Sequence, residues 1–192
     1  MSIDMAGNQD SLADCITTYT GIHMNPLDPK PEDFRSEDIA HALPMICRGN
    51  GHVKTFFSVG QHCINCAREA QAEGLSDRMA LACLLHDASE CYMSDVPRPF
   101  KRNLPSYREA ENRLLSVVFI RFLGSDLSAK EYGTMKRIDN AMLWYDMHEL
   151  LNEEIGPQPE VHIELSYAWR PFSNVEHEYL ELILKFCSGA YR

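Results

Sequence analysis

The sequence has no apolar run near the roughly 20 residues that a membrane-spanning helix needs. Its first stretch, MSIDMAGNQDSLAD, has neither a basic start nor a hydrophobic segment, so it does not look like a secretory signal. Together these absences argue against a membrane protein and against an exported one. We therefore expect a cytoplasmic protein that makes no contact with a membrane.

Positive charge is also scarce. The 192 residues include 18 Lys and Arg against 28 Asp and Glu, which gives a formal net charge of -10. Proteins bind nucleic acid polymers largely by neutralising phosphates, so we expect no nucleic acid polymer as partner. A small phosphorylated substrate fits the composition only if a metal or a few basic residues meet its charge locally.

The seven cysteines are an odd number, and no export signal precedes them. They are therefore expected to be reduced and mostly buried, not paired in a disulfide framework. The spacing Cys63-x-x-Cys66 matches half of a zinc-thiolate site. Because no second cysteine pair or Cys-His pair follows at a suitable spacing, we interpret these two residues as buried thiols.

Strand patterns are nearly absent, although 53–59 could form a short extended piece. Residues 1–35 are polar and broken by three prolines, which predicts an arm or loop outside the core. From residue 36 to 192 we expect one all-α domain, a compact bundle of about five to seven helices, with its main motifs within 48–150. Capping boxes at Ser58/Gln61, Ser128/Glu131 and Ser173/Glu176 help to predict helices at 59–73, 77–90, 106–123, 129–152 and about 174–188.

Four residues on these helices suit a metal. His62 falls in the first turn of its helix, and the apolar run LACLL leads directly into His86 and Asp87. Asp139 shares a helix face with apolar residues, where an unpaired carboxylate would cost several kcal/mol. Two imidazoles and two carboxylates suit Mn, Fe, Co, Ni or Zn better than Mg or Ca. Adjacent His and Asp can face one pocket only near a helix end, which is where the sequence puts them.

The order His62, His86-Asp87, Asp139 resembles the H…HD…D signature of the HD-domain metal-dependent phosphohydrolases. The segments SVGQHC (58–63) and HDASECYMSDVPRPFK (86–101) are similar to the corresponding segments of the bacterial 5′-deoxynucleotidase branch. Small phage relatives, among them triphosphohydrolases that act on dATP, share this core. The resemblance covers roughly residues 36–150 and implies an all-α HD-domain fold.

The resemblance also implies residue roles. It makes His62, His86, Asp87 and Asp139 the metal ligands. Glu90 corresponds to the acidic residue that holds or activates the attacking water, and Asp95 to the one near the sugar and the leaving oxygen. Lys101 matches a lysine of the family block.

The chain departs from the family pattern where the nucleotide binds. The Arg-Trp-Pro stretch that lines the family pocket is replaced by Ala42-Leu43-Pro44, which puts Leu43 at the base pocket. Gln61 and Cys63 replace a glutamate and a serine beside the first histidine. Arg48 and His52 are our candidates for compensating phosphate contacts. The further basic residues Lys54, Arg98 and Arg102 keep a triphosphate substrate open beside a monophosphate.

The implied function is hydrolysis of the 5′ phosphoester of deoxynucleotides. A monophosphate would give nucleoside and phosphate, and a triphosphate such as dATP would give nucleoside and triphosphate. The alternative is a non-catalytic HD module that senses a nucleotide. Relatives form dimers or larger rings, so a homo-oligomer is implied, in a host cytoplasm if a phage encodes the chain.

Asp146 follows Asp139 by seven residues on nearly the same face, with His148 close by. Either could support the ligands from behind, but we favour a helix flank that pairs toward solvent. His162 and His177 are interpreted as surface residues outside the matched core.

Overall fold

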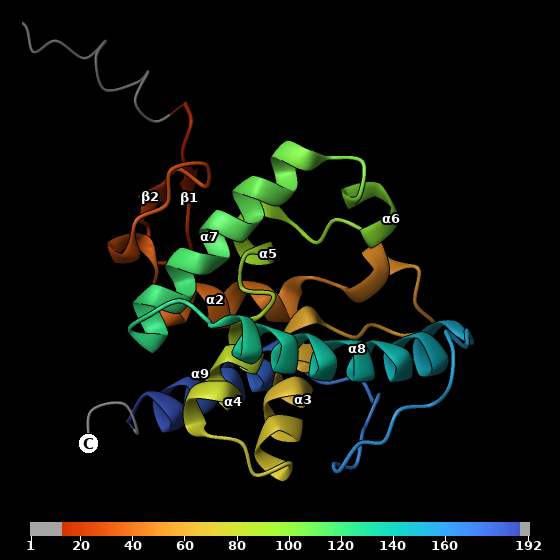
Figure 1. Cartoon of the computed structure of the whole chain (residues 1–192). Coiled ribbons are helices and arrows are strands. Elements are labelled where there is room, and N and C mark those ends of the chain that lie inside the picture. Colours follow the sequence, from red (N-terminus) through yellow and green to blue (C-terminus); the bar gives the residue numbers. More distant parts are fainter. Residues whose placement is uncertain (1–12, 189–192) are drawn as a thin grey trace, which may run out of the picture.

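The computed structural model describes residues 13–188, and these residues form an all-α bundle (Figure 1). Six of its helices have seven residues or more, which confirms the expected fold class. A two-residue antiparallel pair near the start of the described chain is the one sheet in this range. The elements are β1 (Ile16–Thr17), β2 (His23–Met24), α2 (Ser36–Ala42), α3 (Val59–Ala72), α4 (Asp77–Leu85), α5 (Glu90–Met93), α6 (Arg98–Lys101), α7 (Pro105–Leu123), α8 (Ala129–Leu151) and α9 (Phe172–Ser188), with 3-10 turns at Pro31–Asp33, Leu43–Met45 and Arg48–Gly51.

Two of the three predicted capping boxes are confirmed. Ser58 accepts the Gln61 amide at 3.1 Å and begins α3, and the Ser128 amide reaches Glu131 at 2.8 Å at the start of α8. The third prediction, at Ser173, is wrong, because α9 already begins at Phe172. The Pro171 carbonyl accepts the backbone amides of Asn174 and Val175 at the start of that helix. Pro171 precedes the helix, where its lack of an N–H group costs no helical hydrogen bond.

The predicted helix 77–90 is broken in the structure. The α-helix α4 ends at Leu85, and a turn with i→i+3 bonds, Ala88 to Leu85 and Glu90 to Asp87, leads into α5. The His86 ring closes the end of α4 by pairing Nδ1 with the Cys83 carbonyl at 2.8 Å. Tighter 3-10-like bonding rotates consecutive side chains differently from an α-helix, so the break changes how His86 and Asp87 are presented.

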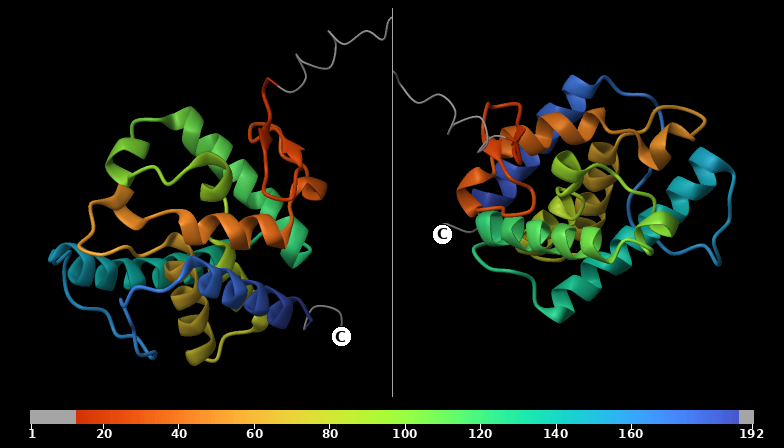
Figure 2. Two further views of the ribbon diagram at one scale, coloured as in Figure 1. Left: turned by 180° about the vertical axis from the view of Figure 1, so that it is seen from behind. Right: turned by 90° about the horizontal axis from the view of Figure 1, so that it is seen from above.

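The core is centred on α4. Residues Leu81 to Leu85 are all at most 2 % exposed, so this helix is buried on every side. It packs against α3, with α8 on one side of the pair and α9 on the other, as the front and back views show (Figure 1 and Figure 2). A helix surrounded in this way has little freedom to move, and its C-terminal end is therefore a rigid support for side chains.

The described part of the N-terminal segment does not behave as a loose arm. Met24 and Phe34 are buried in the core, and the Thr20 amide donates to Asp38 on α2 at 2.7 Å. The expectation that 1–35 lies outside the core is wrong for these residues, because single apolar residues in a proline-broken stretch give no periodic signal; residues 1–12 lie outside the described range.

Two smaller expectations can be checked on the described residues. The extended piece at 53–59 is reduced to one isolated bridge between Cys47 and Ser58. No helix within 13–188 is both long enough and apolar enough to cross a membrane.

Candidate metal centre and adjoining cavity

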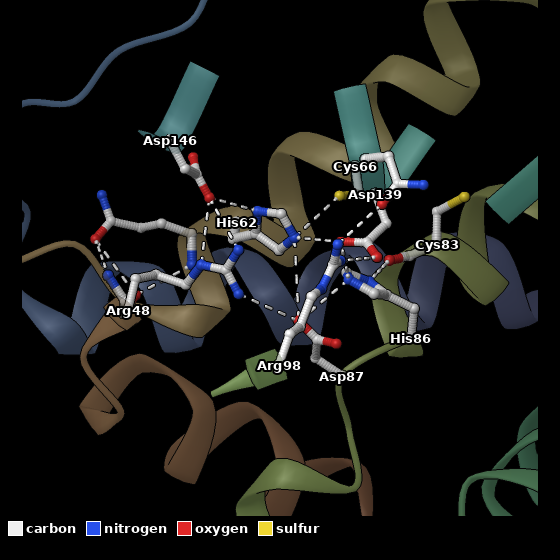
Figure 3. Close-up of polar contacts among 12 residues, drawn as sticks. Arg48, His62, Cys66, Cys83, His86, Asp87, Arg98, Asp139 and Asp146 are labelled. Atoms are coloured by element: carbon white, nitrogen blue, oxygen red, sulfur yellow. Dashed lines mark hydrogen bonds and ion pairs between the residues drawn. The ribbon is translucent and has the colours of Figure 1, made fainter. Parts of the chain in front are cut away.

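The side chains predicted to bind a metal meet at one point between α3, the end of α4 and α8 (Figure 3). His62 Nε2 lies 3.3 Å from Asp139 Oδ1 and 4.0 Å from Asp87 Oδ2. His86 Nε2 lies 3.1 Å from Asp87 Oδ2 and 3.5 Å from Asp139 Oδ1. The tertiary fold thus brings together residues that are up to 77 positions apart in the sequence.

These separations fit donors around one ion. Two donors each about 2.1 Å from a metal are roughly 3.0–3.4 Å apart when adjacent and about 4.2 Å apart when opposite. Both histidines and Asp139 are buried, and Asp87 is only partly exposed. The His86 Nε2 atom is buried without a hydrogen-bond partner among residues 13–188, an arrangement that an ion would resolve. The donor set therefore fits a divalent metal.

The far nitrogen of each ring is anchored. His62 Nδ1 lies 2.8 Å from Asp146 Oδ2, although the pair is not aligned as a good hydrogen bond, and His86 Nδ1 pairs with the Cys83 carbonyl. Holding Nδ1 in this way leaves Nε2 free to face the centre of the cluster, which is how proteins orient metal-binding histidines.

The interpretation of Asp146 as a surface residue is wrong. It is 4 % exposed and, besides His62, it contacts Arg48 at 3.1 Å and accepts the Tyr167 hydroxyl at 3.0 Å. Seven positions separate it from Asp139, so the helical spacing did indicate a shared face. The role of Tyr167 gave no sequence signal, because it lies in the loop that connects α8 and α9.

The cluster is strongly polarised. Burial alone would raise the pKa of Asp87, but the neighbouring His86 lowers that pKa well below its ordinary value, and the two histidines do the same for Asp139. Burial opposes charge on His62 and His86 as well, but neighbouring thiol and carboxyl groups, first Cys66 for His62 and Asp87 for His86, raise the pKa of both rings well above the ordinary value. The centre of the cluster therefore favours positive charge, which a metal ion would supply.

Basic side chains surround the two aspartates. Arg48 lies 3.5 Å from Asp87. Arg98 and Lys136 contact Asp139 Oδ2 at 3.0 and 3.1 Å. Sequence reasoning named Arg48 and Arg98 but missed Lys136, although its position three residues before Asp139 on one helix was a usable signal.

A cavity of about 310 Å³ opens over the cluster. One part of its wall is polar and includes Asp87, Asp139 and the basic side chains, and another part is apolar. The apolar part is built by the C-terminal half of α8 and two adjoining loops, through Val53, Leu143, Met147, Leu150, Leu151 and Ile155. A cavity of this kind can take a ligand that is charged at one end and apolar at the other.

Glu90 and Asp95 both line the cavity. Burial and the charge of Asp87 raise the pKa of Glu90 well above its ordinary value, and its Oε2 atom has no hydrogen-bond partner in the described chain. Burial also raises the pKa of Asp95. Carboxyl groups tuned in this direction suit proton transfer nearer neutral pH.

The four predicted substrate-binding residues divide evenly. Arg48 and Lys101 line the cavity, and Lys101 also pairs with Glu111 at 2.6 Å. Leu43 does not: it is fully buried in the core, because the turn at Leu43–Met45 packs its side chain inward. His52 is exposed and is not among the lining residues. Of the further basic candidates, Arg98 lines the cavity, whereas Lys54 and Arg102 do not.

Two buried thiols stand beside the histidines. Cys66 Sγ is 3.6 Å from His62 Nε2, and His62, Cys66 and His86 form one group that could hold a metal ion. Cys63, His86 and Asp87 form another such group. Cys63 and Cys66 are buried and free, as predicted, but the sequence alone did not place them at the cluster.

A third group, which we call the surface group because it reaches from buried Glu69 through Glu73 to exposed His162, is also a possible metal-binding group. Here the carboxylates already have partners. Buried Glu69 accepts the His162 amide and its ring at 2.8–3.0 Å, and Glu73 pairs with Arg137. His162 and His177 are exposed, as expected.

No protein-family model matches this sequence. It is 37% identical over 103 residues to the uncharacterized protein YfdR of Escherichia coli (strain K12), covering 54% of this chain and 55% of that protein. It is also 37% identical over 109 residues to an uncharacterized protein of Rhodobacter capsulatus, with the same two shares. The chain spans about half the length of the curated relatives it matches.

Proposed function

We propose that this chain is a metal-dependent phosphohydrolase of the HD-domain type that cleaves the 5′ phosphoester of deoxynucleotides. One observation carries the proposal: two imidazole nitrogens and two carboxylate oxygens converge within 3.1–4.0 Å beside a cavity that also contains Glu90 and several basic side chains. The sequence resemblance to HD-domain phosphohydrolases, carried by the same four residues, agrees with this proposal.

His62, His86, Asp87 and Asp139 would hold the ion, which could be Mn, Co, Zn, Fe or Ni. When bound, such an ion polarises a phosphoryl oxygen and acidifies a water molecule. Asp146 and the Cys83 carbonyl keep the two rings turned toward that position.

The basic side chains of the cavity would bind the phosphate. Arg48, Arg98 and Lys136 now contact the aspartates of the cluster, within a chain of net charge -10. Phosphate oxygens can take over these contacts as charge-assisted hydrogen bonds. The apolar wall of the cavity, to which Val53, Leu143 and Ile155 contribute, would then accept the nucleoside part.

Glu90 and Asp95 would carry the protons. In the hydrolysis, Glu90 takes a proton from the attacking water while the water oxygen bonds to the phosphorus next to the 5′ oxygen. The bond from phosphorus to the 5′ oxygen breaks, and Asp95 supplies a proton to that oxygen. The same steps release phosphate from a monophosphate and triphosphate from a triphosphate.

The test compares dAMP and dATP side by side with the wild-type chain loaded with Mn, Co or Zn. We expect deoxyadenosine together with phosphate from dAMP or triphosphate from dATP. The matched control is Glu90→Gln, which should keep the bound metal and slow turnover by about 10²–10⁴-fold. Nucleotide binding by the metal-loaded wild type without either product would overturn the enzyme and favour a sensing module.

A further inference from the structure

Cys66 lies one helical turn after His62 on α3, so the two side chains share a face of that helix. Its side chain is 1 % exposed. The sulfur is 3.6 Å from His62 Nε2, the same nitrogen that faces the two aspartates of the cluster (Figure 3). The thiol therefore reaches the proposed metal centre from within the core.

The distance fits shared ligation. With zinc-to-sulfur and zinc-to-nitrogen distances of about 2.3 and 2.1 Å, neighbouring ligands at angles of roughly 90–120° are about 3.1–3.8 Å apart. The same separation also fits a thiol that donates a weak hydrogen bond to the ring. Geometry around His62 alone does not separate these two arrangements.

His86 provides the second observation. Its Nε2 atom is fully buried and has no hydrogen-bond partner within the described range. His62, Cys66 and His86 place one ligand atom each within 4.8 Å of one another. Cys63 forms a group with His86 and Asp87 instead, so among the described groups Cys66 is the thiol that accompanies both histidines.

We infer that Cys66 is a further metal ligand, which makes the centre a mixed nitrogen, oxygen and sulfur site. The inference rests on the proposed metal centre, but not on the proposed reaction. The thiol proton passes to solvent as the metal–sulfur bond forms. Thiolate favours Zn²⁺ or Co²⁺ over Mn²⁺ or Mg²⁺, so Cys66 would bias the choice of metal toward softer ions.

The experiment titrates the metal-stripped full chain with Co²⁺ and records the absorption spectrum. A thiolate ligand gives an intense near-ultraviolet charge-transfer band that nitrogen and oxygen ligands do not give. We expect this band in the wild type and in Cys63→Ser, and its loss in Cys66→Ser. Cys63 is a matched control because it lies on the same helix, equally buried. Zn²⁺ affinity should fall at least about tenfold in Cys66→Ser, with little change for Mn²⁺.

A second measurement needs no variant, in case Cys66→Ser does not fold. X-ray absorption of the zinc-loaded wild type should show a sulfur scatterer at about 2.3 Å in addition to nitrogen and oxygen. Bound metal without a sulfur signal, or a band lost in Cys63→Ser instead, would overturn the inference and leave the proposed hydrolase intact. A sulfur ligand without any release of phosphate or triphosphate would support Cys66 as a ligand and overturn the proposed hydrolase.

Discussion

The surface group and the buried cluster both bring histidine and carboxylates together, but their polar atoms differ in whether they already have hydrogen-bond partners. At the surface, Glu69 and Glu73 already accept hydrogen bonds from His162 and Arg137. At the cluster between α3, α4 and α8, His86 Nε2 is buried and lies 3.1 Å from Asp87 Oδ2, yet it has no hydrogen-bond partner in the described chain. Proximity of ligand types is common to both, whereas an unsatisfied buried nitrogen is found only in the second.

The surface group has the features of a structural contact, whereas the cluster has the features of a binding site. The surface group ties the loop before α9 to α3, and its hydrogen bonds are complete. The cluster instead gathers Asp87 and Asp139 around two imidazoles, with basic side chains against both carboxylates, and it has a cavity beside it. Four substitutions test this contrast, and they are described from the largest expected effect to the smallest.

Asp139→Ala should abolish metal binding, with a loss of affinity greater than about 100-fold, because the carboxylate lies between both imidazoles. Glu73→Ala, at the surface group, should leave the bound metal unchanged. Elemental analysis after dialysis measures both. Metal loss in Glu73→Ala with metal retained in Asp139→Ala would mean that the surface group is the metal site.

Asp146→Asn should weaken the metal by about 10–100-fold without removing it, since His62 would lose the anion that orients its ring. Competition against a chromogenic chelator gives the affinity. Tyr167→Phe, which removes only the hydroxyl donor to Asp146, is the milder control. An unchanged affinity in Asp146→Asn would show that the ring needs no such anchor.

Glu69→Gln should destabilise the fold by about 1–3 kcal/mol, because a buried acceptor of the His162 amide and ring is weakened, while metal content stays constant. The ion pair also raises the pKa of His162. Its contribution to stability is complete below the ordinary histidine pKa and is lost as pH rises through the raised value. Urea unfolding at several pH values should therefore show the largest difference in the free energy of unfolding between wild type and Glu69→Gln just below the ordinary histidine pKa.

Glu131 belongs to neither group, and Glu131→Gln should lower the free energy of unfolding by roughly 0.5–1 kcal/mol through the capping box of α8. Hydrogen bonds from Arg78 and Ser128 lower the pKa of Glu131 to about 2. A lowered pKa gives stability that is present above the ordinary value of 4.5 and is lost as pH falls through about 2. In thermal unfolding, the melting temperatures of wild type and Glu131→Gln should therefore converge as pH falls toward that value. A difference that stays constant with pH would contradict a stabilising role for the Glu131 carboxylate.

Much of the fold could be predicted from local chemistry. The starts of α3 and α8 follow from a serine followed three residues later by Gln61 or Glu131, because these contacts span a single turn. The early end of α4 could not be predicted in this way. Neither glycine nor proline follows Leu85 to mark a stop, and the bond from the His86 ring to the Cys83 carbonyl shows where the helix ends.

The site divides in the same manner. The four ligand candidates carried a sequence signal, and so did Glu90 and Lys101, both of which line the cavity. Leu43 was expected at the base pocket by alignment with a motif that the chain lacks, and it is a core residue. Tyr167 and Ile155 gave no signal, because irregular loops have no period from which a direction can be read.

The sequence by itself determined the helical class, most helix starts and the residue types suited to a metal, because these depend on contacts within a turn or on side-chain chemistry. The tertiary structure decided which polar atoms are left without partners. Burial of α4 fixes His86 beside α3 and α8, and that packing turns Asp146 from an apparent surface residue into the anchor of His62. Whether a group is satisfied depends on atoms far away in the chain, and no local pattern records them.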